Sequence, residues 1–315
     1  TIAICYLKME KKTEAKDNLF KSIEVTQVDY EIYFLLASIL FEELDYTKAR
    51  FYLHEIVEKG SKNFDVFLLL GKINKELGEF DDSIKFFRKA NKLRRNSAEC
   101  HFYLGSLLMT KKMFTEAKYE FELALEYNPK LSEAYNNLGR IYQHLLKYND
   151  ANECFNKSIN INKNKPEAFI NRGYVYFKML KMEDAEKDFK MAININPNII
   201  ESYYNLIPVL IELNKLEEAE NFANKLLIIN PDNSNTYNCL ASVYSASGKY
   251  EIAEKMARRS ISMQPDFAEA FTNLSSILLR QGKLPESAKT GKRAVELDPK
   301  NPLFHNNLSY VLLKQ

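Results

Sequence analysis

Residues 132–165 read SEAYNNLGRIYQHLLKYNDANECFNKSININKNK, and residues 166–199 read PEAFINRGYVYFKMLKMEDAEKDFKMAININPNI. The two stretches align without a gap, and the same classes of residue return after 34 positions. Within each stretch, two runs of apolar residues recur with the i, i+3, i+4, i+7 spacing of an amphipathic helix. The two stretches therefore predict consecutive helix–turn–helix units of equal length.

The same period extends through the whole chain. Five prolines lie 34 residues, or twice 34, apart: Pro129, Pro197, Pro231, Pro265 and Pro299. This register divides the chain without insertion into the full repeats 30–63, 64–97, 98–131, 132–165, 166–199, 200–233, 234–267 and 268–301, with partial repeats at 1–29 and 302–315. We expect residues 1–315 to form a single array. Neither end has the polar cap that closes a repeat array, so we expect the array to continue beyond this sequence.

Two positions of the repeat carry small side chains, which allow helices to approach closely. Position 20 is Ala or Ser in every repeat that contains it, and position 8 is Gly, Ala or Ser in every repeat except one, which has Ile207. We expect helices at about positions 2–14 and 17–30. The turn between them lies near position 15, where Gly78, Gly248 and Gly282 favour a helix end.

The pattern of a large residue at position 4, Leu at 7 and small residues at 8, 20 and 27 resembles the tetratricopeptide-repeat family. The resemblance covers the whole chain and implies an all-α fold, a right-handed superhelix (α-solenoid) of antiparallel helix pairs. The repeat 200–233 departs most, with Ile207, Leu226 and an in-helix Pro208. Because proline removes a helical hydrogen bond, we expect a kink and altered curvature there.

Composition excludes several classes of protein. The formal net charge of +2 gives no reason to expect a polyanionic partner. Basic residues recur late in the second helix, at positions 25 and 26, where they complement the helix dipole: Arg88, Lys89, Lys157, Lys190, Lys225, Arg258, Arg259, Lys292 and Arg293. We therefore do not expect nucleic acid to bind. No apolar stretch approaches the ~20 residues that cross a bilayer, so membrane insertion is not expected.

The chain lacks the motifs of a catalytic or metal site. Its four cysteines (Cys5, Cys100, Cys154 and Cys239) form no CxxC pair, which favours a reducing, cytoplasmic location. The four histidines form no metal-binding motif, and we expect His101 and His305, at position 4, to lie in the core. Thr290-Gly291-Lys292 lacks the remainder of a phosphate-binding loop. We expect no enzymatic activity, no cofactor and no small-molecule substrate.

The resemblance implies that positions 2, 5, 6, 9, 12 and 13 of the first helices line a concave groove. Position 6 supplies a ladder of amides, Asn137, Asn171, Asn205, Asn273 and Asn307, to which we add Arg140 and Tyr174 of position 9 as groove residues. An amide both donates and accepts hydrogen bonds, so the ladder suits an extended peptide backbone. In this respect it looks like the repeat arms of O-GlcNAc transferases. The alternative is that Asn is simply frequent at position 6 of the family.

The N-terminal part of the predicted groove is apolar instead. Positions 5 and 6 of three consecutive repeats supply large hydrophobic side chains: Phe34, Leu35, Leu68, Leu69, Phe102 and Tyr103. Such a lining either binds a hydrophobic partner or is covered by another segment.

These observations favour a protein-interaction scaffold that binds a protein or an extended peptide, within a larger protein or a multisubunit assembly. A second hypothesis is the substrate-recognition arm of an O-GlcNAc transferase-like enzyme whose catalytic domain lies outside this sequence. A third is a homo-oligomer formed through the array ends or the apolar groove. The residues that a heat-shock chaperone tail clamp requires at positions 5 and 9 are not present.

Overall fold

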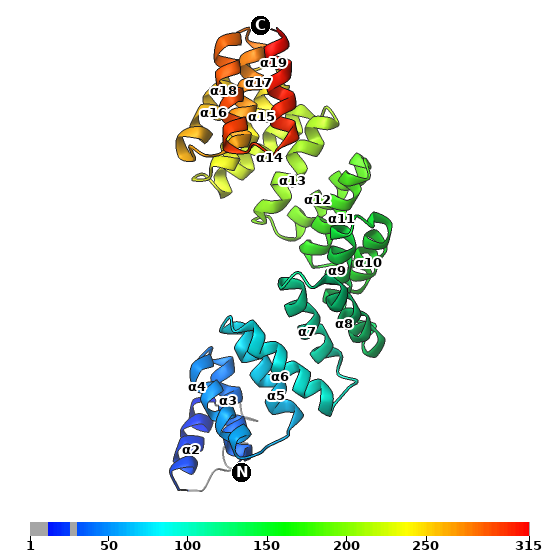
Figure 1. The fold of residues 1–315 in the computed structure, drawn as a ribbon, viewed down its shortest axis with the longest axis vertical. Helices are drawn as coiled ribbons and strands as arrows, with labels where there is room; N and C mark the ends of the chain where they lie inside the picture. The colour runs from blue at the N-terminus through cyan, green and yellow to red at the C-terminus, as the bar shows by residue number, and fades with distance from the viewer. Residues whose placement is uncertain (1–11, 26–29, 315) are drawn as a thin grey trace. The chain divides into compact units, whose positions relative to one another are not determined.

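The computed structural model describes residues 12–25 and 30–314, and over this part of the chain it contains 18 helices and no strand (Figure 1). The helices are α2 (Lys12–Val25), α3 (Tyr30–Glu42), α4 (Tyr46–Glu58), α5 (Phe64–Glu76), α6 (Phe80–Leu93), α7 (Ala98–Thr110), α8 (Phe114–Tyr127), α9 (Ser132–His144), α10 (Tyr148–Ile161), α11 (Pro166–Lys178), α12 (Met182–Ile195), α13 (Ile200–Glu212), α14 (Leu216–Ile229), α15 (Ser234–Ala246), α16 (Tyr250–Met263), α17 (Ala268–Arg280), α18 (Leu284–Leu297) and α19 (Pro302–Lys314). Cys5 and the start of the first partial repeat lie outside the described residues.

The helix boundaries confirm the all-α prediction. In every full repeat the first helix begins at position 1 and ends at position 13, and the second begins at position 17 and ends at position 29 or 30. The expected boundaries differ from these by one residue at most. The 34-residue period therefore places two antiparallel helices in each repeat.

Position 15 adopts a left-handed backbone conformation in every full repeat. Glycine occupies it in three repeats, and other residues occupy it in five: Leu44, Lys112, Leu146, Leu180 and Asn214, each with φ between 57° and 65°. After α11, Leu180 N donates to Phe177 O (3.0 Å) and Lys181 N donates to Tyr176 O (2.9 Å). These two bonds are those of a Schellman motif, which satisfies the last carbonyls of a helix. The turn is thus part of the repeat even where the sequence lacks glycine.

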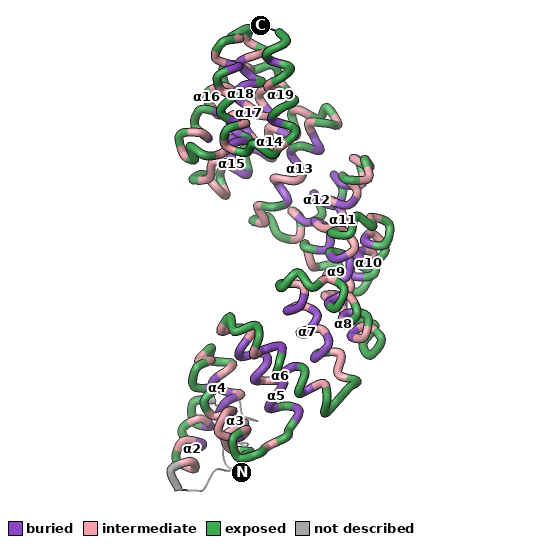
Figure 2. Tube along the Cα trace, viewed as in Figure 1, coloured by how far each residue is buried: buried purple, intermediate pink, exposed green. Residues whose placement is uncertain are grey.

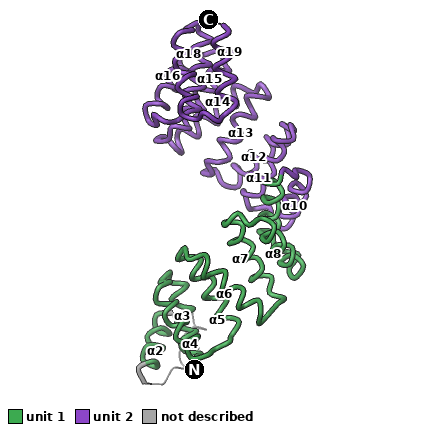
Figure 3. Tube along the Cα trace, in the orientation of Figure 1, with its two compact units in different colours: residues 1–145 green, residues 146–315 purple. Residues whose placement is uncertain are grey.

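The helices form two compact units, residues 1–145 and 146–315, and the division falls in the turn after α9 (Figure 3). Within the described part of each unit, the first helices of successive repeats contact one another: α3, α5, α7 and α9 in one unit, and α11, α13, α15, α17 and α19 in the other. The backbones of the second helices there do not come as close to each other, although charged side chains join some of them. Because the first helices stack more tightly, each unit curves toward them, and they form its concave face.

Position 20 forms the centre of each helix pair. Its small side chains are completely buried in every described repeat: Ala15, Ala49, Ser83, Ala117, Ala151, Ala185, Ala219, Ala253 and Ser287. Buried residues follow the facing sides of the helices (Figure 2). This confirms position 20 as the point of close approach, where a larger side chain would separate the two helices.

Ion pairs join successive repeats on the second-helix side. In the 146–315 unit, a glutamate at position 21 pairs with the lysine at position 16 of the next repeat. The pairs are Glu186–Lys215 (2.7 Å), Glu220–Lys249 (2.7 Å) and Glu254–Lys283 (2.8 Å). In the 1–145 unit the same two positions carry the opposite charges, in Arg50–Glu79 (2.7 Å). At these four junctions an ion pair therefore links one repeat to the next.

The repeat 200–233 accommodates its irregular residues without breaking its first helix. α13 is continuous through Pro208, which is exposed. Ile207 and Leu226 are fully buried in the core of this repeat. The backbones of α13 and α14 approach less closely than those of α5 with α6 or α11 with α12, where position 8 is glycine. The bulky pair thus fills the space between the helices, as expected, and the kink and the change in curvature stay predictions.

One core assignment was wrong. His101 is buried as expected, but His305 is exposed, with its Nε2 2.8 Å from Pro299 O. Both occupy position 4, but position 4 is buried only where a further helix packs against the first helix. In the described residues, α19 contacts only α17 and α18.

Candidate functional site

The predicted ladder amides lie at equivalent places on first helices. Four belong to the 146–315 unit: Asn171 on α11, Asn205 on α13, Asn273 on α17 and Asn307 on α19. Asn137 lies on α9 of the other unit, together with Arg140. All five amides are half-buried, as is Tyr174, whereas Arg140 is exposed. Each of these amides is therefore partly accessible, and their role in peptide binding stays a prediction.

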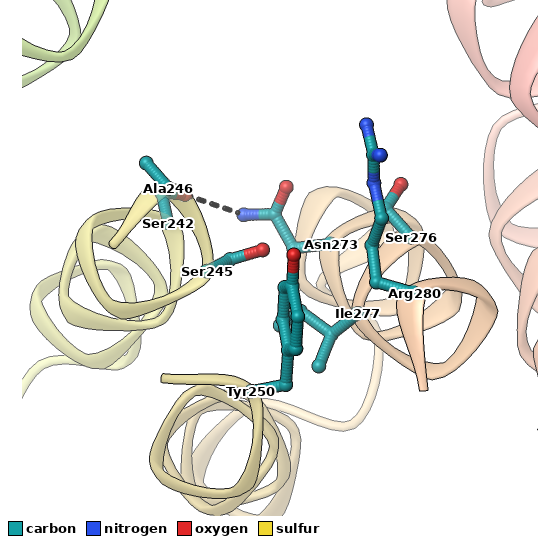
Figure 4. A pocket seen from close by; sticks show the side chains of 8 residues that line it. All are labelled: Ser242, Ser245, Ala246, Tyr250, Asn273, Ser276, Ile277 and Arg280. Carbon is teal, nitrogen blue, oxygen red and sulfur yellow. Dashed lines mark hydrogen bonds between the residues drawn. The ribbon is translucent and has the colours of Figure 1, made fainter. Parts of the chain in front are cut away.

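A pocket of about 470 Å³ opens between α15, α16 and α17 of the 146–315 unit (Figure 4). Polar groups dominate its lining, which consists of Ser242, Ser245, Ala246, Tyr250, Asn273, Ser276, Ile277 and Arg280. Most of these residues occupy positions 6, 9, 12 and 13, the positions that the family resemblance assigns to the groove. Among the site residues predicted from sequence, only Asn273 lines this pocket.

Asn273 is held in place by the helix before it. Its Nδ2 donates to Asn238 Oδ1 (2.7 Å) and to Ser242 Oγ (3.0 Å), and Ser242 Oγ in turn donates to Asn238 O (3.1 Å). Asn238 is itself buried. These bonds occupy both amide hydrogens, so the Oδ1 atom of Asn273 is the group that remains for a ligand (Figure 4).

Three further polar groups of the pocket have no partner among the described residues: the Ser245 hydroxyl, the Tyr250 hydroxyl and the Arg280 guanidinium. The side chains of Ser245, Tyr250 and Asn273 converge, and Arg280 extends alongside Ser276 (Figure 4). Ser276, by contrast, donates to Thr272 O at 3.1 Å. The pocket therefore offers donors from a cation and two hydroxyls, and an acceptor from Asn273.

Sequence reasoning missed Ser245, Tyr250 and Arg280. Ser245 and Arg280 occupy positions 12 and 13, which the family resemblance assigns to the groove. Their positions in the repeat could therefore have identified both as groove residues. Tyr250 begins the second helix, at position 17, where it reaches into the pocket from α16. No spacing in the sequence marks that contribution, because it depends on how α16 packs beneath α15 and α17.

The apolar residues predicted for the N-terminal groove are engaged in helix packing. Leu68 is buried, and Phe34, Leu35, Leu69, Phe102 and Tyr103 are half-buried. The Phe102 ring lies 6.0 Å from that of Phe121, and the Tyr103 ring stacks on Phe87 at 5.3 Å. A hydrophobic partner at this surface stays a prediction. Replacing these apolar residues by serine would not test it cleanly, because the change would also weaken the packing of the unit.

Some of the basic residues of the second helices are paired with acids, among them Arg88, Lys190, Arg258 and Arg293. Lys190 contacts both Glu186 (2.6 Å) and Glu218 (2.5 Å), and Arg258 contacts Glu254 (2.8 Å) and Glu286. Such pairing reduces the positive potential that a polyanion would sense. Across the described ranges, no group of His, Cys, Asp and Glu is arranged to hold a metal ion. No described helix is both long and apolar enough to span a membrane.

Arg172 replaces the leucine of position 7 and makes a buried polar cluster. Its Nε and Nη2 donate to both carboxylate oxygens of Asp188 (2.7 and 2.6 Å), and its Nη1 donates to Asn156 Oδ1 (2.6 Å). Asp188 is almost completely buried. The bidentate geometry, with each charged group paired, identifies this cluster as a structural link between α10, α11 and α12.

Solved structures of repeat proteins resemble this chain. The structure described as "YrrB: a TPR protein with an unusual peptide-binding site" is 22% identical, with a TM-score of 0.52, and covers 58% of this chain and 95% of its own. A chain of the "APC/C hetero-tetramer Cut9-Hcn1" is 14% identical with a TM-score of 0.61, over 96% of this chain and 60% of that one. A tetratricopeptide repeat protein from Parabacteroides merdae is 17% identical with a TM-score of 0.62, over 79% and 98%.

At these identities the likeness concerns the fold alone. This chain spans only 60% of the length of the matched Cut9-Hcn1 chain. No curated protein matches the chain.

Models of tetratricopeptide repeats match residues 64–97, 132–165, 166–199, 222–255 and 240–302. The matches cover more than half of the chain, and those at 64–97, 132–165 and 166–199 coincide with repeats of the register above. Family models, period and helix boundaries agree, and the chain belongs to the tetratricopeptide repeat family.

Proposed function

We propose that this protein is a protein-interaction module that binds an extended segment of a partner polypeptide along its first helices. The observation that carries the proposal is the pocket between α15, α16 and α17, where Asn273 Oδ1, the hydroxyls of Ser245 and Tyr250, and Arg280 have no partner in the described chain. An extended peptide carries one N–H and one C=O per residue, and these groups complement such a lining. The neighbouring ladder residues Asn205 and Asn307 would extend the contact.

Similar proteins support this function. YrrB has a peptide-binding site, and Cut9 and Hcn1 assemble as a hetero-tetramer. The fold exposes polar side chains on a curved, prearranged surface, which lowers the ordering cost of binding. A substrate-recognition arm of an O-GlcNAc transferase-like enzyme would use the same amides. It is the second candidate, because the ladder alone favours it.

A peptide selection tests the proposal. A phage-displayed library of random peptides should yield ligands for the wild-type protein, with affinities measured afterwards on synthetic peptides by fluorescence polarisation. Replacing Ser245 and Asn273 together by Ala should weaken binding by about tenfold, because each lost hydrogen bond contributes ~0.5–1.5 kcal/mol.

The matched control is Lys255→Ala, an exposed residue on the α16 surface outside the pocket. This variant should retain the wild-type affinity. If the pocket variant binds every selected peptide as tightly as the wild type while remaining folded by circular dichroism, the pocket does not carry the function.

A further inference from the structure

We infer that the pocket between α15, α16 and α17 recognises an acidic side chain of the bound segment, with Arg280 as its counter-ion. The inference rests on the proposed function and names the chemistry of the ligand. No acidic residue lines this pocket, and Arg280 is the only charged group in its lining. A carboxylate placed there meets a cation and no repulsion.

Arg280 lacks the acid partners that several nearby cations have. On the second-helix side, Arg258 is bound by Glu254 and Glu286, Lys283 by Glu254, and Arg293 by Glu296 (3.0 Å). Among the described residues, Arg280 has neither an acid nor an aromatic ring as partner. A guanidinium matches a carboxylate bidentately, so Arg280 keeps this capacity for a ligand.

The other polar groups specify how the acidic residue is presented. Asn273 and Arg280 are seven residues apart on α17, about two helical turns or ~10 Å along the axis. An extended chain covers this distance in about three residues. A backbone N–H can donate to Asn273 Oδ1 while an acidic side chain within about three residues reaches Arg280. The Ser245 hydroxyl supplies a donor on the opposite helix, α15, and the Tyr250 hydroxyl supplies one from α16 (Figure 4).

A carboxylate can come from a side chain or from a chain terminus, and the structure favours the side chain. The row of first helices continues beyond the pocket in both directions, because α13 packs against α15 on one side and α19 packs against α17 on the other. Half-buried Asn205 and Asn307 occupy the ladder position on these two helices. The bound segment therefore passes through the site and presents an internal Asp or Glu.

Peptide selection on wild type and on Arg280→Gln tests this inference. Peptides fused at their C-terminus to the phage coat offer only internal acids. Wild type should enrich Asp or Glu at one position, and Arg280→Gln should lose this enrichment. For a synthetic, C-terminally amidated ligand, changing its acid to the amide should weaken binding about tenfold, as expected for a charge-assisted hydrogen bond. The same peptide change should have no effect on Arg280→Gln.

Arg293→Gln removes an equal charge from α18 outside the pocket and should behave as wild type. Ligands enriched without any acid preference would overturn the inference and leave the proposed function standing. Failure to select any ligand would overturn both. If acid-free peptides with a free C-terminal carboxylate bind as tightly as the internal acids, the assignment to a side chain is wrong.

Discussion

Gly71 on α5 faces the ring of Phe87 on α6 so closely that a methyl group on Gly71 would lie 2.7 Å from the ring carbon Cε1. Phe87 is completely buried. Gly105 with Phe121, and Gly173 with Phe189, repeat the arrangement. In the repeat 30–63 the same two positions carry Ala37 and Leu53, both fully buried. In these four repeats, a glycine at position 8 goes with phenylalanine at position 24, and the larger alanine goes with the smaller leucine.

This size matching predicts a compensating pair of substitutions. Gly71→Ala should destabilise the protein by ~1–3 kcal/mol through overpacking. Phe87→Leu alone should also destabilise it, because it leaves a cavity. The double variant reproduces the pair of the repeat 30–63 and should recover much of the loss, giving a coupling energy of ~0.5–3 kcal/mol in urea unfolding. Strictly additive losses would show that the two positions do not depend on each other.

The left-handed turns predict a stabilising substitution. Leu180 has φ of 58° and is 79% exposed, so its side chain adds strain and little packing. Leu180→Gly should raise the free energy of unfolding by about 0.5–1 kcal/mol, since glycine adopts this conformation without a Cβ clash. Leu180→Ala keeps the Cβ and should not gain.

The reverse change provides a second check of the turn. Gly248 has φ of 73°, and an added Cβ would meet no atom within 4 Å. Gly248→Ala should therefore cost about 1 kcal/mol from backbone strain alone. A thermal melt that shows no change for either Leu180→Gly or Gly248→Ala would contradict this account of position 15.

The Arg172–Asp188 pair predicts that removing one partner destabilises the protein, whereas replacing both partners by apolar residues does not. Arg172→Ala should destabilise the protein by ~3–5 kcal/mol, because it leaves the buried Asp188 carboxylate without its counter-ion. Replacing Arg172 by Leu and Asp188 by Met together copies Leu240 and Met256 at the same positions of the repeat 234–267. This apolar pair should be as stable as wild type or more so.

Urea unfolding monitored by far-UV circular dichroism distinguishes the two cases. If the double variant is as unstable as Arg172→Ala, the destabilisation comes from losing the polar cluster itself and not from leaving the Asp188 carboxylate unpaired.

The inter-repeat ion pairs predict a loss of stability in acid. The hydrogen bond from Lys283, with that from Arg258, lowers the pKa of Glu254 from 4.5 to about 2. The unfolded chain binds a proton at this carboxyl near pH 4.5, whereas the folded chain does so only near pH 2. The stabilisation is therefore fully present above pH 4.5 and is lost as the pH falls toward 2.

Glu254→Gln should lower the stability at neutral pH by on the order of 2 kcal/mol, and its stability should depend less on pH across this range. Glu296→Gln is the matched control, because Glu296 is mostly exposed beside Arg293 and such pairs contribute about 0–1 kcal/mol. Parallel stability–pH curves for Glu254→Gln and wild type would show that the ion pair is not the cause.

Much of the fold follows from local sequence patterns. Helical periodicity, the small residues of positions 8 and 20 and the prolines at position 32 depend only on neighbours within one repeat. The helix boundaries could therefore be predicted to within a residue. The glycines at Gly78, Gly248 and Gly282 indicated the turn at position 15, but Leu180 did not, because its left-handed backbone is imposed by the two helices that it joins.

The arrangement of the site could not be predicted from the sequence, because it depends on how the helices stack. Asn273 could be assigned to the concave face from its position in the repeat, whereas the orientation of its amide depends on Asn238 and Ser242 of the preceding repeat. Arg280 has no acid partner among the described residues, and Arg172 at position 7 has one in Asp188. A one-dimensional period determines which face a residue occupies. Which polar groups find partners is decided by contacts between helices, because hydrogen bonds and ion pairs form only at distances that packing sets.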